Sequence, residues 1–330
     1  MIDRRMFNAL AVTAVAAHAC PASAQHPKTL PSVGIVNPTL PIADTLGLDP
    51  RSPLMSALVQ GLRDLGWVDE RTVRLERRSA EGDPTRAAGI FADLLARNVD
   101  VIMLGGARWL HDAALQATGT IPIVAVFQDD PVAAGLIGSL ARPGRNLTGV
   151  TLATGPEFQS KRLQFLIEIA PRTARAAFLA PPEVLRQYRE VALPAGVAVI
   201  PIPHVVGTRY DEAFAAVLRE QGDALMVGGG VHYGNAQSIA DFAAASRLPT
   251  IFPWREGVDA GGLMSYGTNV AGVWRQSARL VDRFLKGSKI GDVPVEQPTN
   301  FELIVNSKTA KALGLTIPPS ILIRADEVIE

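Results

Sequence analysis

Cysteine is almost absent from this chain, because the only one among its 330 residues is Cys20. A single thiol forms no internal disulfide, and Cys20 lies in a segment that we expect to be removed. Arg4-Arg5 precedes a mostly apolar stretch, and Ala22 to Ala24 has the A-x-A form of a cleavage site, so residues 1–24 are predicted to be a secretory signal peptide. The expected location is the periplasm, for a mature chain without thiol chemistry.

Two other interpretations of this segment are disfavoured. A membrane anchor needs ~20 apolar residues, and the stretch is shorter. A lipid anchor on Cys20 is disfavoured because the preceding residues, Ala17-His18-Ala19, do not match those that usually precede a lipidated cysteine. Arg4-Arg5 leaves the twin-arginine export route open beside the general secretory one. No later segment is apolar enough to span a membrane.

An excess of either charge is also lacking, since 32 basic residues balance 32 acidic ones. A neutral chain has no field that would hold a polyanion, so nucleic acid is not an expected partner. The composition, 48% hydrophobic and 19% charged, is that of a globular protein. The length favours two domains over one core.

The usual enzyme signatures are missing as well. Neither Gly105-Gly106 nor Gly228 to Gly230 completes the G-x-G-x-x-G pattern of dinucleotide-binding folds, and no Walker or G-x-S-x-G sequence occurs. His111, His204 and His232 do not have the spacing of metal ligands. We therefore predict no catalytic residue, no cofactor and no metal site.

What the chain does contain is an alternation of short apolar runs with amphipathic segments. Residues 98–154 predict a strand, a glycine turn, a helix, a strand, an acidic turn, a helix and a strand. The runs 99–104 and 121–127 are typical of strands buried on both faces of a parallel sheet. Ligands of such sheets bind beyond the carboxyl ends of the strands, so the turns at Gly105-Gly106 and at 128–130 are expected to share one crevice.

The same alternation, which begins with a strand at 32–36 and continues to about residue 252, predicts the α/β class. A glycine-flanked segment at 261–267, an amphipathic helix through 273–285 and a strand at 301–305 do not form a third domain. We therefore expect two Rossmann-like lobes joined by a multi-crossing hinge, with a ligand crevice between them.

The candidate ligand contacts lie in strand-end turns and in the glycine-flanked segment. Helix amino termini behind the glycine turns could receive a carboxylate, and Asp130 or Glu256 could receive an ammonium group. Trp109, Tyr233 and Trp254 could cover an apolar or aromatic group. The candidates are Asn37, Gly106, Ala107, Arg108, Trp109, Asp129, Asp130, Glu183, Gly230, His232, Tyr233, Trp254, Glu256 and Tyr266.

Each of these residues also has a purely structural interpretation. Trp109 and Trp254 could pack a loop against a helix, and Arg255-Glu256 could be a solvated helix start. Asp130, which precedes a proline, could be only a helix cap. Asp129-Asp130 could be a catalytic or Mg²⁺-binding pair, although neighbouring residues at a strand end usually point to opposite sides, which disfavours shared chemistry.

Several stretches, spread in order over nearly the whole mature chain, resemble one family. They are ALVQGLRDLGW at 57–67, AEGDP at 80–84, DDPV at 129–132, SLARPGRNLTG at 139–149, GGLMSYG at 261–267, PVEQPT at 294–299 and KTAKALGLTIPP at 308–319. The chain is thereby similar to the ABC transporter substrate-binding proteins of the type that includes tryptophan- and tyrosine-binding members.

The resemblance implies the type I periplasmic binding protein fold. It implies an amino-terminal lobe of residues 30–149 plus 264–294 and a carboxyl-terminal lobe of residues 150–263 plus 295–330. It also implies a small-molecule ligand and an inner-membrane ABC permease with its ATPase as partners. The turns at 108–109, 180–182 and 228–235 depart from the family pattern, so the ligand cannot be carried over from relatives.

The resulting hypothesis is a monomeric, exported solute-binding protein that captures an amino acid or related small carboxylate and has no enzymatic activity. The alternatives are a periplasmic ligand-sensing module for a membrane receptor and an exported enzyme on the same scaffold. An adjacent permease and ATPase would favour the first, an adjacent sensor kinase the second, and turnover of the ligand the third.

Overall fold

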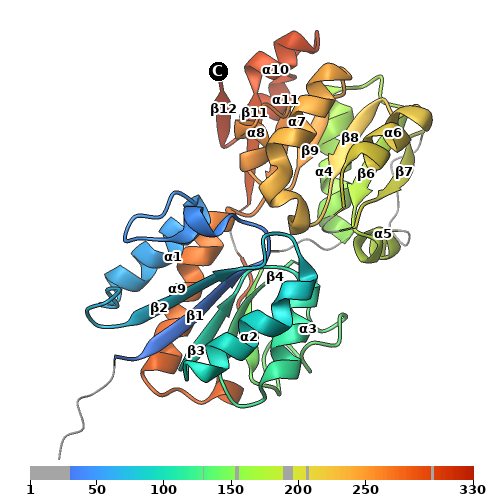
Figure 1. Ribbon diagram of the computed structural model, residues 1–330. Helices are drawn as coiled ribbons and strands as arrows, with labels where there is room; N and C mark the ends of the chain where they lie inside the picture. Colours follow the sequence, from blue (N-terminus) through green and yellow to red (C-terminus); the bar gives the residue numbers. More distant parts are fainter. Residues whose placement is uncertain (1–29, 129, 153–155, 189–195, 206–207, 299–300) are drawn as a thin grey trace, which may run out of the picture.

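The computed structural model describes residues 30–128, 130–152, 156–188, 196–205, 208–298 and 301–330. The chain forms two lobes, each built on one β-sheet with helices on both faces (Figure 1). The predicted signal peptide, with Cys20, lies outside the described residues. Within the described part, no helix combines the length and the apolar character needed to cross a membrane.

The sheet of the first lobe is parallel throughout, with the strand order β2-β1-β3-β4-β5. Four of its strands are buried at every position, as the apolar runs predict, whereas the edge strand β2 alternates between buried and more exposed residues. The strands are β1 (Ser32–Asn37), β2 (Arg74–Ser79), β3 (Val101–Leu104), β4 (Ile123–Phe127) and β5 (Leu147–Thr151).

Two pairs of helices cover this sheet. Helices α1 and α9 pack on one face, and α2 and α3 pack on the other (Figure 1). The α1 and α9 backbones approach closely at Gly61, where an added Cβ would lie 2.9 Å from the Cβ of Ala278. The helices are α1 (Pro53–Asp64), α2 (Ala87–Ala96), α3 (Arg108–Ala117) and α9 (Val270–Leu285), with the short helices η1 (Ile42–Thr45), η2 (Pro84–Arg86) and η4 (Ile290–Asp292).

The second lobe contains a sheet of order β12-β11-β10-β9-β8-β6-β7, in which only the β10–β11 pair is antiparallel among the described pairs. Its strands are β6 (Arg175–Ala180), β7 (Ala198–Pro203), β8 (Ala224–Val227), β9 (Thr250–Phe252), β10 (Met264–Gly267), β11 (Glu302–Asn306) and β12 (Glu327–Ile329). Its helices are α4 (Pro156–Ile169), α5 (Pro182–Tyr188), α6 (Asp211–Arg219), η3 (Gly230–Asn235), α7 (Ala236–Ala245), α8 (Glu256–Asp259), α10 (Ser307–Ala312) and α11 (Pro319–Arg324).

Alternate residues of these strands serve opposite faces of the sheet. In β6, Ala177 and Leu179 belong to the core that also contains α6 and α7 residues, whereas Ala176 and Phe178 belong to the core beneath α4 and α5. This alternation is the period of two that places successive side chains on opposite sides of a strand. Both faces of the sheet are therefore covered.

Sheet membership corrects the lobe boundaries predicted from the sequence. A boundary after Gly149 would cut β5, and a first-lobe segment starting at Met264 would remove β10 from the sheet in which it pairs with β9 and β11. Beyond the expected boundary at Pro294, the N–H of Glu296 donates to the carbonyl of Gly149 (2.9 Å), and the carbonyl of Glu296 accepts from the N–H of Thr151 (3.0 Å). Each crossing therefore lies a few residues later than predicted, because strand pairing, rather than the glycines and prolines, decides where the chain changes lobe.

The helix predicted after the acidic turn is wrong. Residues 130–146 contain turns but no α-helix. One helix-like turn starts at Asp130, whose Oδ1 accepts from the backbone N–H groups of Val132 (2.8 Å) and Ala133 (3.2 Å). It ends at Gly135, whose φ of 70° is incompatible with a continuing helix.

Candidate functional site

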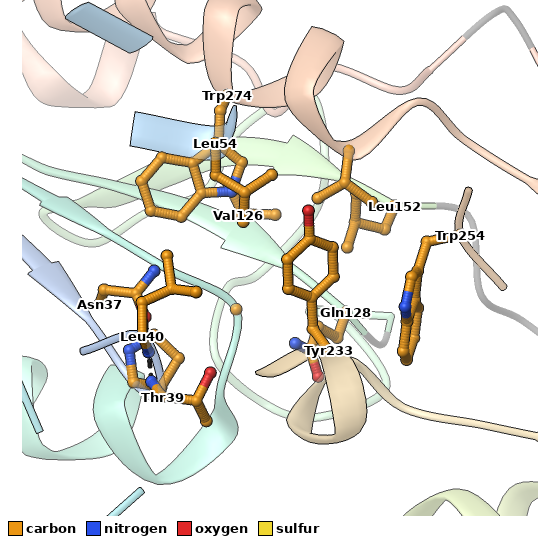
Figure 2. A pocket seen from close by; sticks show the side chains of 13 residues that line it. Asn37, Thr39, Leu40, Leu54, Val126, Gln128, Leu152, Tyr233, Trp254 and Trp274 are labelled. Atoms are coloured by element: carbon orange, nitrogen blue, oxygen red, sulfur yellow. Dashed lines mark hydrogen bonds between the residues drawn. The ribbon is translucent and has the colours of Figure 1, made fainter. Parts of the chain in front are cut away.

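A pocket lies beyond the carboxyl ends of the first-lobe strands, where residues of both lobes meet (Figure 2). It holds about 420 Å³ of space not filled by atoms, part of which is open to solvent. Its lining residues are Asn37, Pro38, Thr39, Leu40, Leu54, Gly106, Val126, Gln128, Leu152, Tyr233, Trp254, Val270 and Trp274.

The loop after β1 forms one wall of the pocket, and a buried amide holds its shape. Asn37 is 2% exposed, and its Oδ1 accepts from the backbone N–H groups of Thr39 (2.9 Å) and Leu40 (2.8 Å). The Ser79 hydroxyl, at the end of β2, donates to the Leu40 carbonyl (2.5 Å). Such side-chain bonds replace a backbone turn, so the Leu40 side chain is presented to the pocket in a fixed position.

The glycine turn after β3 lies against the residue that follows the neighbouring strand β4. A Cβ added to Gly106 would lie 2.6 Å from Cγ of Gln128, the residue that follows β4. A residue larger than glycine would therefore push Gln128 out of place. The turn is followed by Ala107, which is buried, and then by the first residues of α3.

The floor of the pocket is apolar and comes from separate parts of the first lobe. Trp274 of α9 is 2% exposed, and its indole lies beside Leu54 of α1 and near Val126 of β4 (Figure 2). Val270 and Leu152 complete this surface. The floor therefore requires α9, which returns to the first lobe from the far end of the chain.

Two aromatic residues of the second lobe face that floor. Tyr233 of η3 and Trp254, which follows β9, have ring centroids 5.7 Å apart, and in Figure 2 Tyr233 stands between Trp254 and Leu40. Trp254 is buried, and its indole Nε1–H has no hydrogen-bond partner in the described part of the chain. That N–H is available to an acceptor on a ligand.

A half-buried carboxyl group supports Tyr233 from behind. The Tyr233 hydroxyl donates to Oε1 of Glu256, the first residue of α8. Burial raises the pKa of the Glu256 carboxyl, and the same burial, together with the nearby Glu256 charge, raises the pKa of Tyr233. Among the described residues, no side chain that lines the pocket is charged, and Glu256 borders the pocket through its hydrogen bond with Tyr233.

Four of the predicted contact residues line the pocket, namely Asn37, Gly106, Tyr233 and Trp254, and Glu256 contacts one of them. Gly230 begins the same short helix η3 that carries Tyr233. Asp129 lies outside the described residues, as does the side chain of Glu183, whose backbone is part of α5.

Several other predicted residues have local structural roles. Arg108 is ion-paired with Asp112 at 2.8 Å on the surface of α3, and Trp109 packs against the core beneath that helix. Asp130 is exposed and caps the turn described above, which is its structural interpretation. Tyr266 packs in the second lobe against Phe165, with ring centroids 4.9 Å apart.

His232 lies beside the pocket but faces the interior of the second lobe. It is fully buried, and its Nδ1 lies 2.7 Å from the hydroxyl oxygen of Tyr210. The ring of Tyr210 stacks on the ring of His204. Burial, with a smaller effect of His204, lowers the pKa of His232 to about 3. No group of three or more His, Cys, Asp or Glu residues in the described part of the chain has an arrangement suited to a metal ion.

Most of the apolar lining could not be expected from the sequence. Leu54 lies on the buried face of α1, and tertiary contacts decide that the helix with Trp274 packs in the first lobe. Leu40 lies in the loop after β1, Leu152 follows β5 where the chain leaves the first lobe, and Val270 is the first residue of α9. No periodic pattern distinguishes such positions from ordinary core residues.

Two α/β lobes with a pocket where they meet define the class of type I periplasmic binding proteins. A family model described as ABC transporter substrate binding protein matches residues 42–329, so the chain belongs to that family. The fold and the family inferred from the sequence motifs are thus confirmed.

Three relatives illustrate the similarity. A tyrosine-binding protein of Clostridioides difficile is 21% identical over 263 residues, which are 78% of this chain and 75% of that protein. A conserved domain protein from Vibrio cholerae has a TM-score of 0.80 at 23% identity, covering 90% of this chain and 99% of that one. An ABC domain from Streptococcus pneumonia in complex with L-Trp has a TM-score of 0.77 at 22% identity, covering 91% of this chain and all of that one (100%).

Proposed function

We propose that this protein is the solute-binding component of an ABC importer and that it holds an amino acid with an aromatic or large apolar side chain between its lobes. The observation that carries the proposal is the uncharged pocket in which Tyr233 and Trp254 of one lobe oppose Leu40 and Trp274 of the other. Such a surface matches an apolar or aromatic group. The tyrosine-binding relative and the L-Trp complex support the same ligand class.

The polar groups around the pocket match the other end of an amino acid. Glu256 would receive the ammonium group, directly or through the Tyr233 hydroxyl. The free Trp254 indole N–H would donate to an oxygen of the ligand. The ligand would leave chemically unchanged, since no arrangement of nucleophile and base lies in this pocket among the described residues.

Export, release and delivery complete the proposal. The signal peptide would direct a monomeric mature chain to the periplasm, where the permease and its ATPase would accept the ligand. Uptake of radiolabelled ligand by cells with and without this gene would test delivery. Uptake that is unaffected by deletion, combined with intact binding, would favour the sensing role over transport.

A thermal-unfolding screen of the mature chain against amino acids, small carboxylates and aromatic acids tests the binding itself. A ligand of the folded state stabilises it by RT ln(1 + [L]/Kd), which is about 2.7 kcal/mol at one hundred times Kd. We expect L-Trp, L-Tyr or L-Phe to give the largest shift and Trp254→Ala to remove most of it. Equal shifts with polar amino acids, or none with aromatic ones, would contradict the proposed ligand class.

A further inference from the structure

Helix α4 carries a buried guanidinium group close to the place where the chain passes between the lobes. Arg162 is 1% exposed and Gln159, one turn earlier, is 2% exposed. Arg162 donates from Nε to the carbonyl of Tyr266 (2.7 Å) and from Nη1 to Oε1 of Gln159 (3.0 Å). These two bonds fix the plane of the guanidinium group and bring the Gln159 amide against it.

Two donors of this pair have no acceptor. Neither Nη2 of Arg162 nor Nε2 of Gln159 has a hydrogen-bond partner in the described chain, and no described carboxylate forms an ion pair with Arg162. Burial lowers the pKa of Arg162 to about 9, so the group is still a cation at neutral pH. An unpaired buried charge costs several kcal/mol, and buried polar groups without partners are rare. The combination indicates that an anion completes the site.

The position of the two donors connects them with the pocket. A Cβ added to Gly267, at the carboxyl end of β10, would lie 3.2 Å from Nη2 of Arg162 and 2.0 Å from the carbonyl oxygen of Pro253, which follows β9. Pro253 immediately precedes Trp254, which lines the pocket. The guanidinium group therefore lies at the carboxyl ends of β9 and β10, the side on which sheets of this type bind ligands.

Helix geometry favours an anion at the same place. Gln159 lies in the first turn of α4, a helix of 14 residues, where the free N–H groups and the helix dipole attract negative charge. Glu157 in the same turn is exposed and forms no ion pair with Arg162 among the described residues. Arg162 and Gln159 therefore present donors without supplying a carboxylate of their own.

We propose that Nη2 of Arg162 and Nε2 of Gln159 form a carboxylate-binding site, which holds the carboxylate of the solute while its side chain lies against Trp254 and Tyr233. This inference rests on the proposed function for the identity of the solute. The carboxylate site itself follows from the two unpartnered donors. It assigns the recognition of the carboxylate to the second lobe, which also supplies Trp254 and Tyr233, while Leu40 and Trp274 of the first lobe lie on the opposite side of the pocket.

The experiment compares the thermal unfolding of wild type, Arg162→Met and Gln159→Glu in sodium acetate and in sodium chloride of equal ionic strength. In the wild type we expect a saturable rise of the unfolding temperature with acetate. Arg162→Met lacks the cation and Gln159→Glu supplies an internal carboxylate, so both should lose the acetate effect. Gln159→Glu should also unfold at a higher temperature than the wild type without acetate. Glu157→Gln, an exposed change in the same turn, should keep the wild-type response.

Binding of L-Trp, L-Tyr and L-Phe, each beside its decarboxylated amine, separates this inference from the proposed function. Removal of one partner of a buried charged pair predicts a loss of affinity of ~30-fold or more in Arg162→Met or Gln159→Glu, and a similar loss for the amines with wild type. An acetate effect and an amino-acid affinity that both survive in these variants would overturn the carboxylate site and leave the proposed function intact. An acetate effect that depends on Arg162, without binding of any aromatic amino acid, would support the site and contradict the proposed solute.

Discussion

Two tyrosines of the second lobe, the half-buried Tyr233 and the buried Tyr188, differ in the surroundings of their hydroxyl groups. The Tyr233 hydroxyl donates to Glu256, whereas that of Tyr188 is buried with no partner in the described chain. Tyr233→Phe leaves a half-buried carboxylate oxygen of Glu256 without its donor, which we expect to cost about 1–3 kcal/mol of unfolding free energy and to weaken ligand binding. Denaturant unfolding of both variants checks this.

Tyr188→Phe is the matched control, because it removes a hydroxyl group that has no bond to lose. Its unfolding free energy should equal or exceed that of the wild type, and its ligand affinity should be unchanged. Equal losses in the two variants would mean that the Tyr233–Glu256 bond has no special role.

His232 makes the stability dependent on pH with a definite sign. Its pKa in the folded state is about 3, against 6.5 for an unperturbed histidine. Between these values the unfolded chain binds a proton that the folded chain does not, so the contribution is fully present above pH 6.5 and is lost as the pH falls toward 3. Chemical unfolding between pH 7 and 4 should show stability falling with acid.

The variant His232→Gln isolates this proton. Its unfolding free energy should depend less steeply on pH, by up to ~1.4 kcal/mol per pH unit, which is the slope of one proton. His111, whose pKa burial lowers to about 4, contributes a second proton and remains in the variant. An unchanged slope would show that His232 has the same pKa in the folded and unfolded protein.

At the scale of elements, the contact between α1 and α9 depends on one missing side chain. A Cβ at Gly61 would lie 2.9 Å from both the Cβ of Ala278 and the carbonyl oxygen of Arg275. Gly61→Ala should therefore destabilise the protein by about 1–3 kcal/mol, although alanine is the better helix former. Gly89 of α2 has no atom within 4 Å of an added Cβ, so Gly89→Ala should stabilise by up to about 1 kcal/mol. A comparison of the two unfolding free energies tests the close approach of the helices.

Elements with strong local sequence patterns are predictable from the sequence. The lobe in which an element packs is not predictable in this way. The strands at 101–104 and 224–227 follow from apolar runs that end in glycine. The sequence at Asp130 predicts a helix start, because a capping residue has the same sequence pattern whether the helix continues or ends after one turn. Helix α9 joins the first lobe because its apolar face packs against α1 and the first sheet, and a local sequence pattern does not predict such a contact.

The candidate site likewise contains residues that could be predicted from the sequence and residues that could not. Asn37, Gly106, Tyr233 and Trp254 were predictable because ligand sites of parallel sheets lie at strand ends. Arg162 was not, since a basic residue within a helix ordinarily indicates a solvated face, and only its burial and free Nη2 distinguish it.

At the scale of the whole molecule, the two lobes come close at Thr39 and Gly234. A Cβ added to Gly234 would lie 3.6 Å from the Cβ of Thr39, a separation typical of disulfides. The combination of Thr39→Cys with Gly234→Cys should therefore join the lobes on oxidation, and the described chain contains no other cysteine to compete. We expect a faster-migrating band in non-reducing electrophoresis and slow ligand exchange that dithiothreitol restores. Failure to crosslink would contradict the closeness of the two loops.

Helix α9 also has a consequence for how the protein is made. A ribosome that has finished all five strands of the first lobe must still synthesise most of the second before α9 emerges and covers α1. Released chains that end at Gly267 should therefore have a protease-sensitive first lobe, whereas released chains that end at Glu296 and contain α9 should resist digestion there. The first lobe, although it is synthesised first, would be among the last parts to fold completely, and in the proposed export this delay would let the secretion machinery engage the unfolded polypeptide.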